Sequence, residues 1–104
     1  MRTVPYPSPA EILIEEFLNP LHISPQDLAK AIAIPESVIN EIITGQNQIT
    51  ADIGLRLSRY FGLSEGFWTG LQDDYNRAIT KDKLQAVLMQ IIPLNYANDV
   101  TELH

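Results

Sequence analysis

The sequence predicts an all-α fold of five or six short helices around one core. Proline, glycine and helix-capping residues divide the 104 residues into segments of helical length. Within these segments, apolar residues recur three and four positions apart, which is the spacing of one helix face. No segment alternates apolar and polar residues as a half-buried strand would. We expect a folded domain over residues 1–78 and a C-terminal helix and tail over residues 79–104.

The first helix has a well-defined predicted start and end. Ser8 is a favourable N-cap, Pro9 suits the first helical position, and Glu11 completes a capping box. The helix is expected to run to about Leu18. It should end at Asn19-Pro20, because the residue before a proline disfavours helical geometry.

The next two helices are separated by a short turn. A second Ser-Pro pair, Ser24-Pro25, marks the start of the second helix. The third should run from about Pro35 to Thr44 and end at Gly45 in a left-handed conformation. Three further helices are expected over residues 51–61, 65–79 and 81–92, each starting after a hydroxyl side chain: Thr50, Ser64 and Thr80.

The composition excludes several classes of protein. A hydrophobic fraction of 45% with 19% charged residues is typical of a globular chain. No apolar run reaches the roughly 18 residues of a transmembrane helix, and the N-terminus lacks the apolar stretch of a secretory signal. Cysteine is absent, so neither a disulfide framework nor a thiolate metal site is expected. We therefore expect a cytoplasmic protein with no membrane partner.

The charge balance is acidic. Thirteen Asp and Glu against seven Lys and Arg give a formal net charge of −6. Such a chain is poorly suited to indiscriminate binding of nucleic acids or anionic membranes, which needs excess positive charge. The same charge suits a basic protein partner, because complementary fields speed association.

Residues for catalytic or metal chemistry are scarce. The two histidines, His22 and His104, lie far apart in the sequence, and metal sites usually gather several ligands at fixed spacings. Adjacent acids such as Glu15-Glu16 diverge by about 100° on a helix and are expected to be solvated. No glycine-rich phosphate loop occurs. We expect no enzymatic activity, no cofactor and no metal.

The segment from Pro25 to Thr44 fits a DNA-reading helix-turn-helix better than the alternative, a plain α-helical hairpin. Ala29 is the small residue needed where the two helices cross. Ala33 lies at the turn, where glycine is commonest, and Ile34 is expected to lie beneath the turn. The apolar positions that should anchor both helices are Leu28, Ile32, Ile39 and Ile42.

Motifs outside this segment resemble the HigA antitoxin family, also known as VapI or addiction-module antidotes. The family usually opens with H-P-G-E-I-L-x-E-E-F-L-x-P-L, and here Ser8 and Ala10 replace the histidine and the glycine. The F-W-x-x-L-Q-x-x-Y signature is matched by residues 67–75. Further matches lie in residues 49–52, 55–57 and 61–62, and the resemblance covers about residues 5–78.

This resemblance implies a bacterial protein with a Cro/C1-type, lambda repressor-like helix-turn-helix domain and a C-terminal helical extension. Members of the family are commonly homodimers that repress their own operon. They also neutralise a cognate HigB toxin, a small RelE-like ribonuclease that cuts mRNA on ribosomes. The partners implied here are a double-stranded DNA operator, a HigB/RelE-like toxin and a second copy of the chain.

In a Cro/C1-type domain, the first turns of the second motif helix read base edges. The corresponding residues are Pro35, Glu36, Ser37, Asn40 and Glu41. Asn and Ser side chains suit base edges, whereas Glu accepts only from cytosine amino groups and otherwise repels phosphate. Phosphate contacts are expected from neutral side chains and helix N-termini, namely Ser24, Gln26, Gln46, Asn47, Gln48 and Thr50.

Apolar residues near the C-terminus exceed what a core of this size must bury. The candidates for a homodimer interface are Trp68, Leu84, Val87, Leu88 and Ile91. For Trp68, whose neighbours Leu71 and Tyr75 follow at helical spacing, burial in the core is the alternative.

Three functions are compatible with these patterns. The first is a DNA-binding repressor and antitoxin, and the second is a stand-alone helix-turn-helix regulator. The third is a protein-interaction module that keeps the fold but binds little DNA. The third is favoured by the two acids of the reading helix and by Lys30 being the only basic residue from position 3 to position 55.

Overall fold

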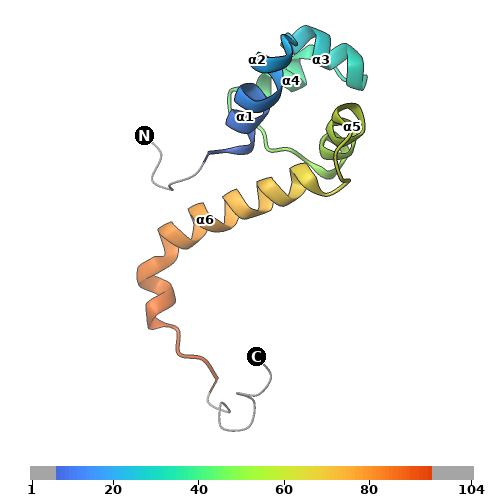
Figure 1. Ribbon diagram of the computed structural model, residues 1–104. Coiled ribbons are helices and arrows are strands. Elements are labelled where there is room, and N and C mark those ends of the chain that lie inside the picture. Colours follow the sequence, from blue (N-terminus) through green and yellow to red (C-terminus); the bar gives the residue numbers. More distant parts are fainter. Residues whose placement is uncertain (1–6, 95–104) are drawn as a thin grey trace.

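The computed structural model describes residues 7–94, and all the regular structure in this range is helical (Figure 1). The elements are α1 (Pro9–Ile12), η1 (Leu13–Leu18), α2 (Asn19–Leu21), α3 (Pro25–Ile32), α4 (Glu36–Ile43), α5 (Ala51–Phe61) and α6 (Phe67–Gln90). The first five α-helices pack together, whereas α6 runs out of this body (Figure 1). The predicted all-α fold is confirmed. No helix in residues 7–94 has the length and apolarity to span a bilayer.

The first helical stretch contains a wide turn. The predicted capping box is present, since Ser8 Oγ accepts the Glu11 N–H at 3.2 Å and Glu11 Oε1 accepts the Ser8 N–H at 2.8 Å. The predicted end at Asn19-Pro20 is wrong, because α2 continues to Leu21. The π-helical segment η1 precedes it, so Pro20 lies in the first turn of α2. There its missing N–H disrupts little.

The π-helical turn serves the core. Leu13 and Leu18 are both buried, although residues five apart lie about 140° apart on a regular α-helix. The wider π turn brings both toward the same side. Phe17, in the same turn, packs against Phe61 and Trp68 with ring centroids 4.7 and 5.2 Å away. One short segment with an irregular turn therefore supplies two buried side chains and a partly buried aromatic ring to the core.

Four segments end at a residue in the left-handed conformation: His22 (φ 56°), Ala33 (φ 60°), Gly45 (φ 82°) and Gly62 (φ 71°). The prediction for Gly45 is confirmed. In each case the following N–H bonds to a carbonyl five residues earlier: Ile23 to Leu18, Ile34 to Ala29, Gln46 to Glu41 and Leu63 to Ser58. This is the Schellman arrangement, in which the residue after the left-handed one often packs back on the helix. The three apolar residues in this position, Ile23, Ile34 and Leu63, do pack against the core.

The predicted core of the helix-turn-helix is confirmed. Its five anchoring and crossing residues are buried: Leu28, Ala29, Ile32, Ile39 and Ile42. Ile34 is partly buried and packs against them. Because α3 and α4 both contribute side chains to this core, the packing of Ile39 and Ile42 fixes the orientation of α4.

The structure corrects the predicted break at Thr80. A single helix, α6, runs from Phe67 to Gln90, through Thr80 and through the expected boundary between residues 78 and 79. Threonine is tolerated inside a helix, and no proline or glycine lies near residue 80 to stop it. The helix ends before Pro93, which disfavours helical geometry in the residue before it.

Ser64 does not cap α6 with its side chain. The helix starts at Phe67 after Gly66, which has no side-chain cap, and the Ser64 carbonyl accepts the Phe67 N–H at 3.1 Å. Trp68, one residue further, is 0% exposed. We therefore remove Trp68 from the expected dimer interface, because a fully buried side chain leaves no surface for a second copy.

Two glycines in helices α5 and α6 should respond oppositely to substitution. A Cβ on Gly54 would lie 3.1 Å from Thr69 Cγ2, whereas nothing lies within 4 Å of one on Gly70. Gly54→Val should lower the free energy of unfolding by about 1–3 kcal/mol through overpacking. Gly70→Ala should raise it by about 0.5–1 kcal/mol because alanine restricts the unfolded chain. Urea unfolding followed by circular dichroism measures both, and a destabilising Gly70→Ala would contradict this packing.

Candidate nucleic-acid interface

Helix α4 presents one exposed face. Pro35, Glu36, Ser37 and Asn40 are exposed, while Ile39 and Ile42 are buried on the opposite side. The structure thus places four of the five predicted base-reading residues together. Pro35 precedes the helix as its N-cap residue. Asn40 is the side chain on this face best suited to bidentate bonding with adenine.

Glu41, the fifth predicted reader, is held by the loop that follows α4. Its Oε1 accepts a hydrogen bond from Asn47 Nδ2 at 2.6 Å, and its main-chain oxygen accepts the N–H groups of Gln46 and Asn47 at 2.8 and 3.1 Å. The Glu41 side chain is only partly exposed. One of the two acids of α4 is therefore engaged within the chain, which reduces its availability to repel phosphate.

The predicted phosphate-binding residues lie on two elements. Ser24 and Gln26 are exposed at the N-terminus of α3, where Ser24 Oγ accepts the Asp27 N–H at 3.0 Å. The other four are exposed in the loop between α4 and α5, or at its end: Gln46, Asn47, Gln48 and Thr50. Thr50 Oγ1 caps α5 by accepting the Ile53 N–H at 3.3 Å.

An open groove of about 410 Å³ brings part of this set together. Its apolar wall includes Ile34, Val38, Ile42 and Ile53. Its polar lining includes Asn47, Gln48 and Thr50, and Pro35 also borders it. The start of α4 and three predicted phosphate-binding residues therefore surround one depression.

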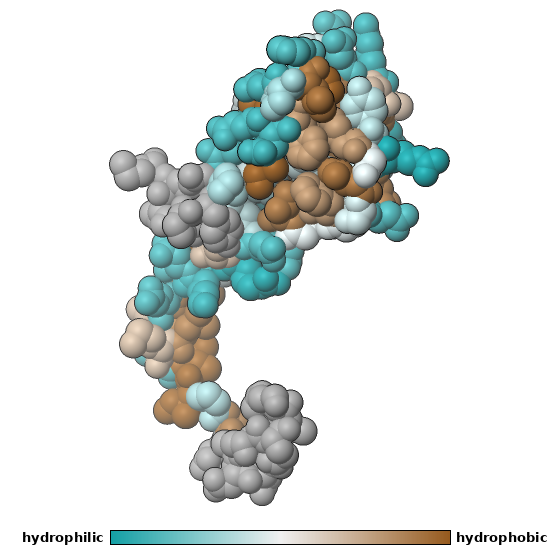
Figure 2. All heavy atoms as spheres, in the orientation of Figure 1, coloured by the Kyte–Doolittle hydropathy of each residue, from teal (hydrophilic) through white to brown (hydrophobic). Residues whose placement is uncertain are grey.

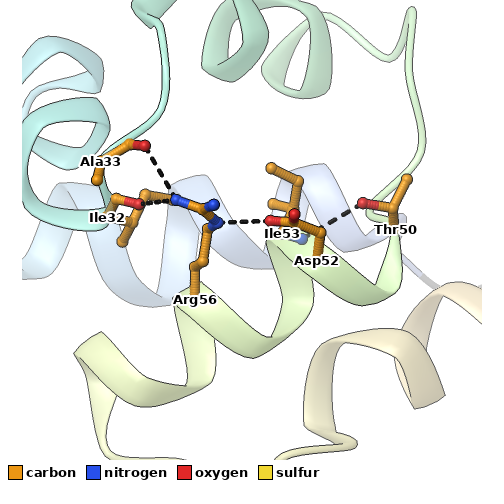
Figure 3. A network of polar contacts seen from close by, with 6 residues as sticks. All are labelled: Ile32, Ala33, Thr50, Asp52, Ile53 and Arg56. Carbon is orange, nitrogen blue, oxygen red and sulfur yellow. Dashed lines mark hydrogen bonds and ion pairs between the residues drawn. The ribbon is translucent and has the colours of Figure 1, made fainter.

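Arg56 connects α5 to the turn between α3 and α4 (Figure 3). Its Nη1 donates to the carbonyl oxygens of Ile32 and Ala33 at 2.8 and 2.9 Å. Its Nε contacts Asp52 Oδ1 at 2.5 Å. A guanidinium offers five donors in a fixed plane, so a single side chain can serve both carbonyls and the carboxylate. Arg56 thus supplies partners for carbonyls at the end of α3.

Residues 14–68 match the family model described as helix-turn-helix. The chain belongs to the helix-turn-helix family that includes the HigA antitoxins. It is 44% identical to virulence-associated protein I of Dichelobacter nodosus over 84% of this chain and 80% of the relative. These matches confirm the family resemblance seen in the motifs.

Two solved structures show the same fold. The Pseudomonas aeruginosa antitoxin HigA, solved with the higBA promoter, is 38% identical with a TM-score of 0.79, covering 85% of this chain and 97% of its own. Another Pseudomonas aeruginosa protein, in complex with its operator DNA, is 38% identical with a TM-score of 0.81, covering 91% and 98%. The Cro/C1-type fold expected from the sequence is confirmed.

The surface formed by α4 and the loop after it carries little positive charge. Lys30 is exposed on α3, but Arg56 is paired with Asp52, and Arg77 on α6 is paired with Asp73 and Asp74. The four exposed side chains of the loop and its end, Gln46, Asn47, Gln48 and Thr50, carry neutral hydroxyl or amide groups.

Sequence reasoning missed several residues of this region. Thr44 is exposed one turn beyond Asn40, and its Oγ1 donates to the Asn40 carbonyl at 2.9 Å. The helical spacing of Ser37, Asn40 and Thr44 could have indicated it. No local sequence signal marks Arg56 as a site residue, and only its contacts to residues 23 and 24 positions away reveal its role.

Metal-binding side chains do not gather in the part of the chain that the structure describes. In residues 7–94, no group of three or more His, Cys, Asp or Glu side chains could hold a metal ion. His22 ends α2 in a left-handed backbone conformation. His22 is exposed in a surface turn.

Proposed function

We propose that this protein is a HigA-type antitoxin of the cytoplasm, which represses its own operon by binding DNA and neutralises a HigB/RelE-like ribonuclease. The observation that carries the proposal is the exposed face of α4 beside a loop of neutral hydrogen-bonding groups. It occurs on a fold shared with an antitoxin HigA solved with its promoter. Docking α4 in the major groove lets its first turns reach base edges.

The two parts of this face have different tasks. Asn40 and Ser37 are suited to reading bases, with Asn40 the adenine reader. The amides and hydroxyls of the loop fix the position of α4 by bonding to phosphate oxygens, as most protein–DNA hydrogen bonds do. Few cationic contacts mean that few counterions are released on binding. The affinity therefore depends on hydrogen bonds and on two copies binding together.

Asn40→Ala should weaken binding to the chain's own promoter by about 1–3 kcal/mol, the usual loss of a good base contact. Glu36→Gln should instead tighten binding to a scrambled duplex, because it removes repulsion of phosphate. Fluorescence anisotropy with both duplexes at several salt concentrations measures these effects. The salt slope should be shallower than that of a repressor with six or more cationic phosphate contacts.

A steep slope would show that basic residues outside α4 and its loop carry the contact. The interaction-module function is favoured by Glu36 and by the net charge of −6. The interaction-module function replaces DNA binding as the conclusion if micromolar protein at low salt binds no promoter duplex, with or without the toxin.

The toxin is expected to be a small basic protein. A cationic ribonuclease and a chain of net charge −6 attract each other at long range, which raises the association rate. The neighbouring reading frame is the natural place to find it. This partner also separates the antitoxin from a stand-alone regulator, which has no toxin.

Co-expression with the neighbouring reading frame should yield a stable complex and restore growth of cells that the neighbouring product alone arrests. Pull-down and growth curves measure the two effects. Asn40→Ala is the matched control: it should weaken operator binding and leave protection intact if the toxin contacts another surface. Failure of the wild-type chain to protect the cells would exclude the antitoxin function.

Helix α6, together with Ile91 directly after its end, supplies the surface proposed for the homodimer. Leu84, Val87, Leu88 and Ile91 are 40, 50, 43 and 61% exposed, and hydrophobic residues cover the outer part of α6 (Figure 2). At about 100° per residue, Leu84 and Leu88 lie roughly opposite Trp68 on the helix. The stripe therefore faces away from the side of α6 that packs on the core, and a second copy can cover it. Two copies would present two α4 helices to a two-fold operator.

Leu88→Glu should convert the dimer to a monomer, because it places a charge within the apolar stripe. Ala86→Glu is the matched control, since residue 86 lies about 160° round the helix from residue 88 and carries the same new charge. Light scattering after size-exclusion chromatography measures the mass. A wild-type monomer at high concentration would contradict the proposed dimer.

A further inference from the structure

Three side-chain amides connect α6 to the loop that follows α4. Gln72 Oε1 accepts the main-chain N–H of Ile49 at 2.9 Å. Gln72 Nε2 donates to Asn76 Oδ1 at 3.1 Å, and Asn76 Nδ2 donates to Gln48 Oε1 at 3.1 Å. Gln72 and Asn76 are one turn apart and half-buried, while Gln48 is exposed. We call the hydrogen-bonded set Gln72, Asn76 and Gln48 the amide relay.

The direction of the relay is fixed at one end. A main-chain N–H can only donate, so Ile49 requires an acceptor, and Ile49 is only 4% exposed. An amide side chain carries its acceptor and donors on opposite sides. Once Gln72 turns its oxygen to Ile49, its nitrogen must face Asn76, whose nitrogen must then face Gln48. Rotation of any one amide would set two donors or two acceptors against each other.

The relay therefore determines which end of Gln48 is available to a ligand. Its oxygen is occupied by Asn76, and within residues 7–94 its Nε2 has no hydrogen-bond partner. Gln48 also lines the groove beside α4. The exposed end of this side chain is consequently a pair of N–H donors. A phosphate oxygen accepts such donors, whereas the carbonyl end would repel it.

We propose that Gln72 and Asn76 are positioning residues for DNA binding: they orient the Gln48 amide so that it donates to a backbone phosphate. The proposal rests on the proposed function, because it needs DNA at the α4 face. It extends that function to α6, whose Gln72 and Asn76 act through Gln48. On a neutral face, the correct orientation of each donor replaces part of what positive charge supplies elsewhere.

Asn76→Asp tests the relay because it keeps an oxygen toward Gln72 Nε2 and replaces the donor toward Gln48 with an oxygen. Gln48 then satisfies the carboxylate with its own nitrogen and turns its carbonyl outward. Asn76→Asp and Gln48→Ala should each weaken binding to a fluorescein-labelled duplex of the chain's own promoter by about 3- to 10-fold, the range of one lost hydrogen bond. A scrambled duplex should lose a similar factor, since phosphate contacts carry no sequence information.

A double-mutant cycle separates orientation from the added negative charge. In a Gln48→Ala background, Asn76→Asp should weaken binding by less than about 2-fold, because no amide remains to be turned. In a Gln46→Ala background, which changes the same loop outside the relay, Asn76→Asp should keep its full effect. Equal losses from Asn76→Asp in all three backgrounds would overturn the proposal and assign the effect to charge alone.

The free protein gives a second readout. In ¹H–¹⁵N spectra, Asn76→Asp should move the side-chain amide signals of Gln48 and Gln72 and the main-chain signal of Ile49, while the thermal melting point stays close to that of the wild type. Unmoved signals would overturn the relay even if the promoter is bound. If the wild-type chain binds no promoter duplex, Asn40→Ala is also without effect, and the proposed function fails together with this role of the relay.

Discussion

The position of α4 depends on one left-handed residue. Ala33 ends α3 with φ 60°, and the N–H of Ile34 then reaches the Ala29 carbonyl at 3.0 Å. A left-handed conformation costs a residue with a Cβ about 1–2 kcal/mol, so other contacts must offset it. Ile34 packs on the core, and Arg56 bonds to the Ala33 and Ile32 carbonyls. The direction in which α4 leaves the turn, and with it the whole reading face, follows from this local arrangement.

Helix α6 joins two regions that the rest of the chain keeps apart. Its first turns complete the core through Trp68 and pack closely against α5 at Gly54. The adjoining turn holds the α4–α5 loop through Gln72 and Asn76. Its outer half is exposed and carries an apolar stripe roughly opposite Trp68. One continuous helix therefore joins the proposed dimer surface to the proposed phosphate-binding loop, and it bends in its outer part (Figure 1).

The acidic character of the chain is compatible with a DNA-binding face because of how the charges are arranged. Glu41 is bonded to Asn47, and Asp52 is paired with Arg56. Glu36 lies in the first turn of α4, where the helix dipole favours a negative charge. Neutral donors are thus left to meet the phosphates in the proposed DNA complex, and the excess acids remain available to the proposed basic partner.

The sequence by itself determined the class of fold, the helix-turn-helix and the predicted face of α4. These features are encoded locally: serine caps, prolines, Gly45 and the apolar spacing of residues 28–42 each act within a few positions. Only the tertiary structure decided that η1 widens, that α6 continues through Thr80, and that Trp68 is fully buried. It also decided the roles of Arg56 and Gln72, whose partners lie 23 or 24 positions away in the chain. Contacts between residues so far apart are set by how helices pack, and no local pattern specifies them.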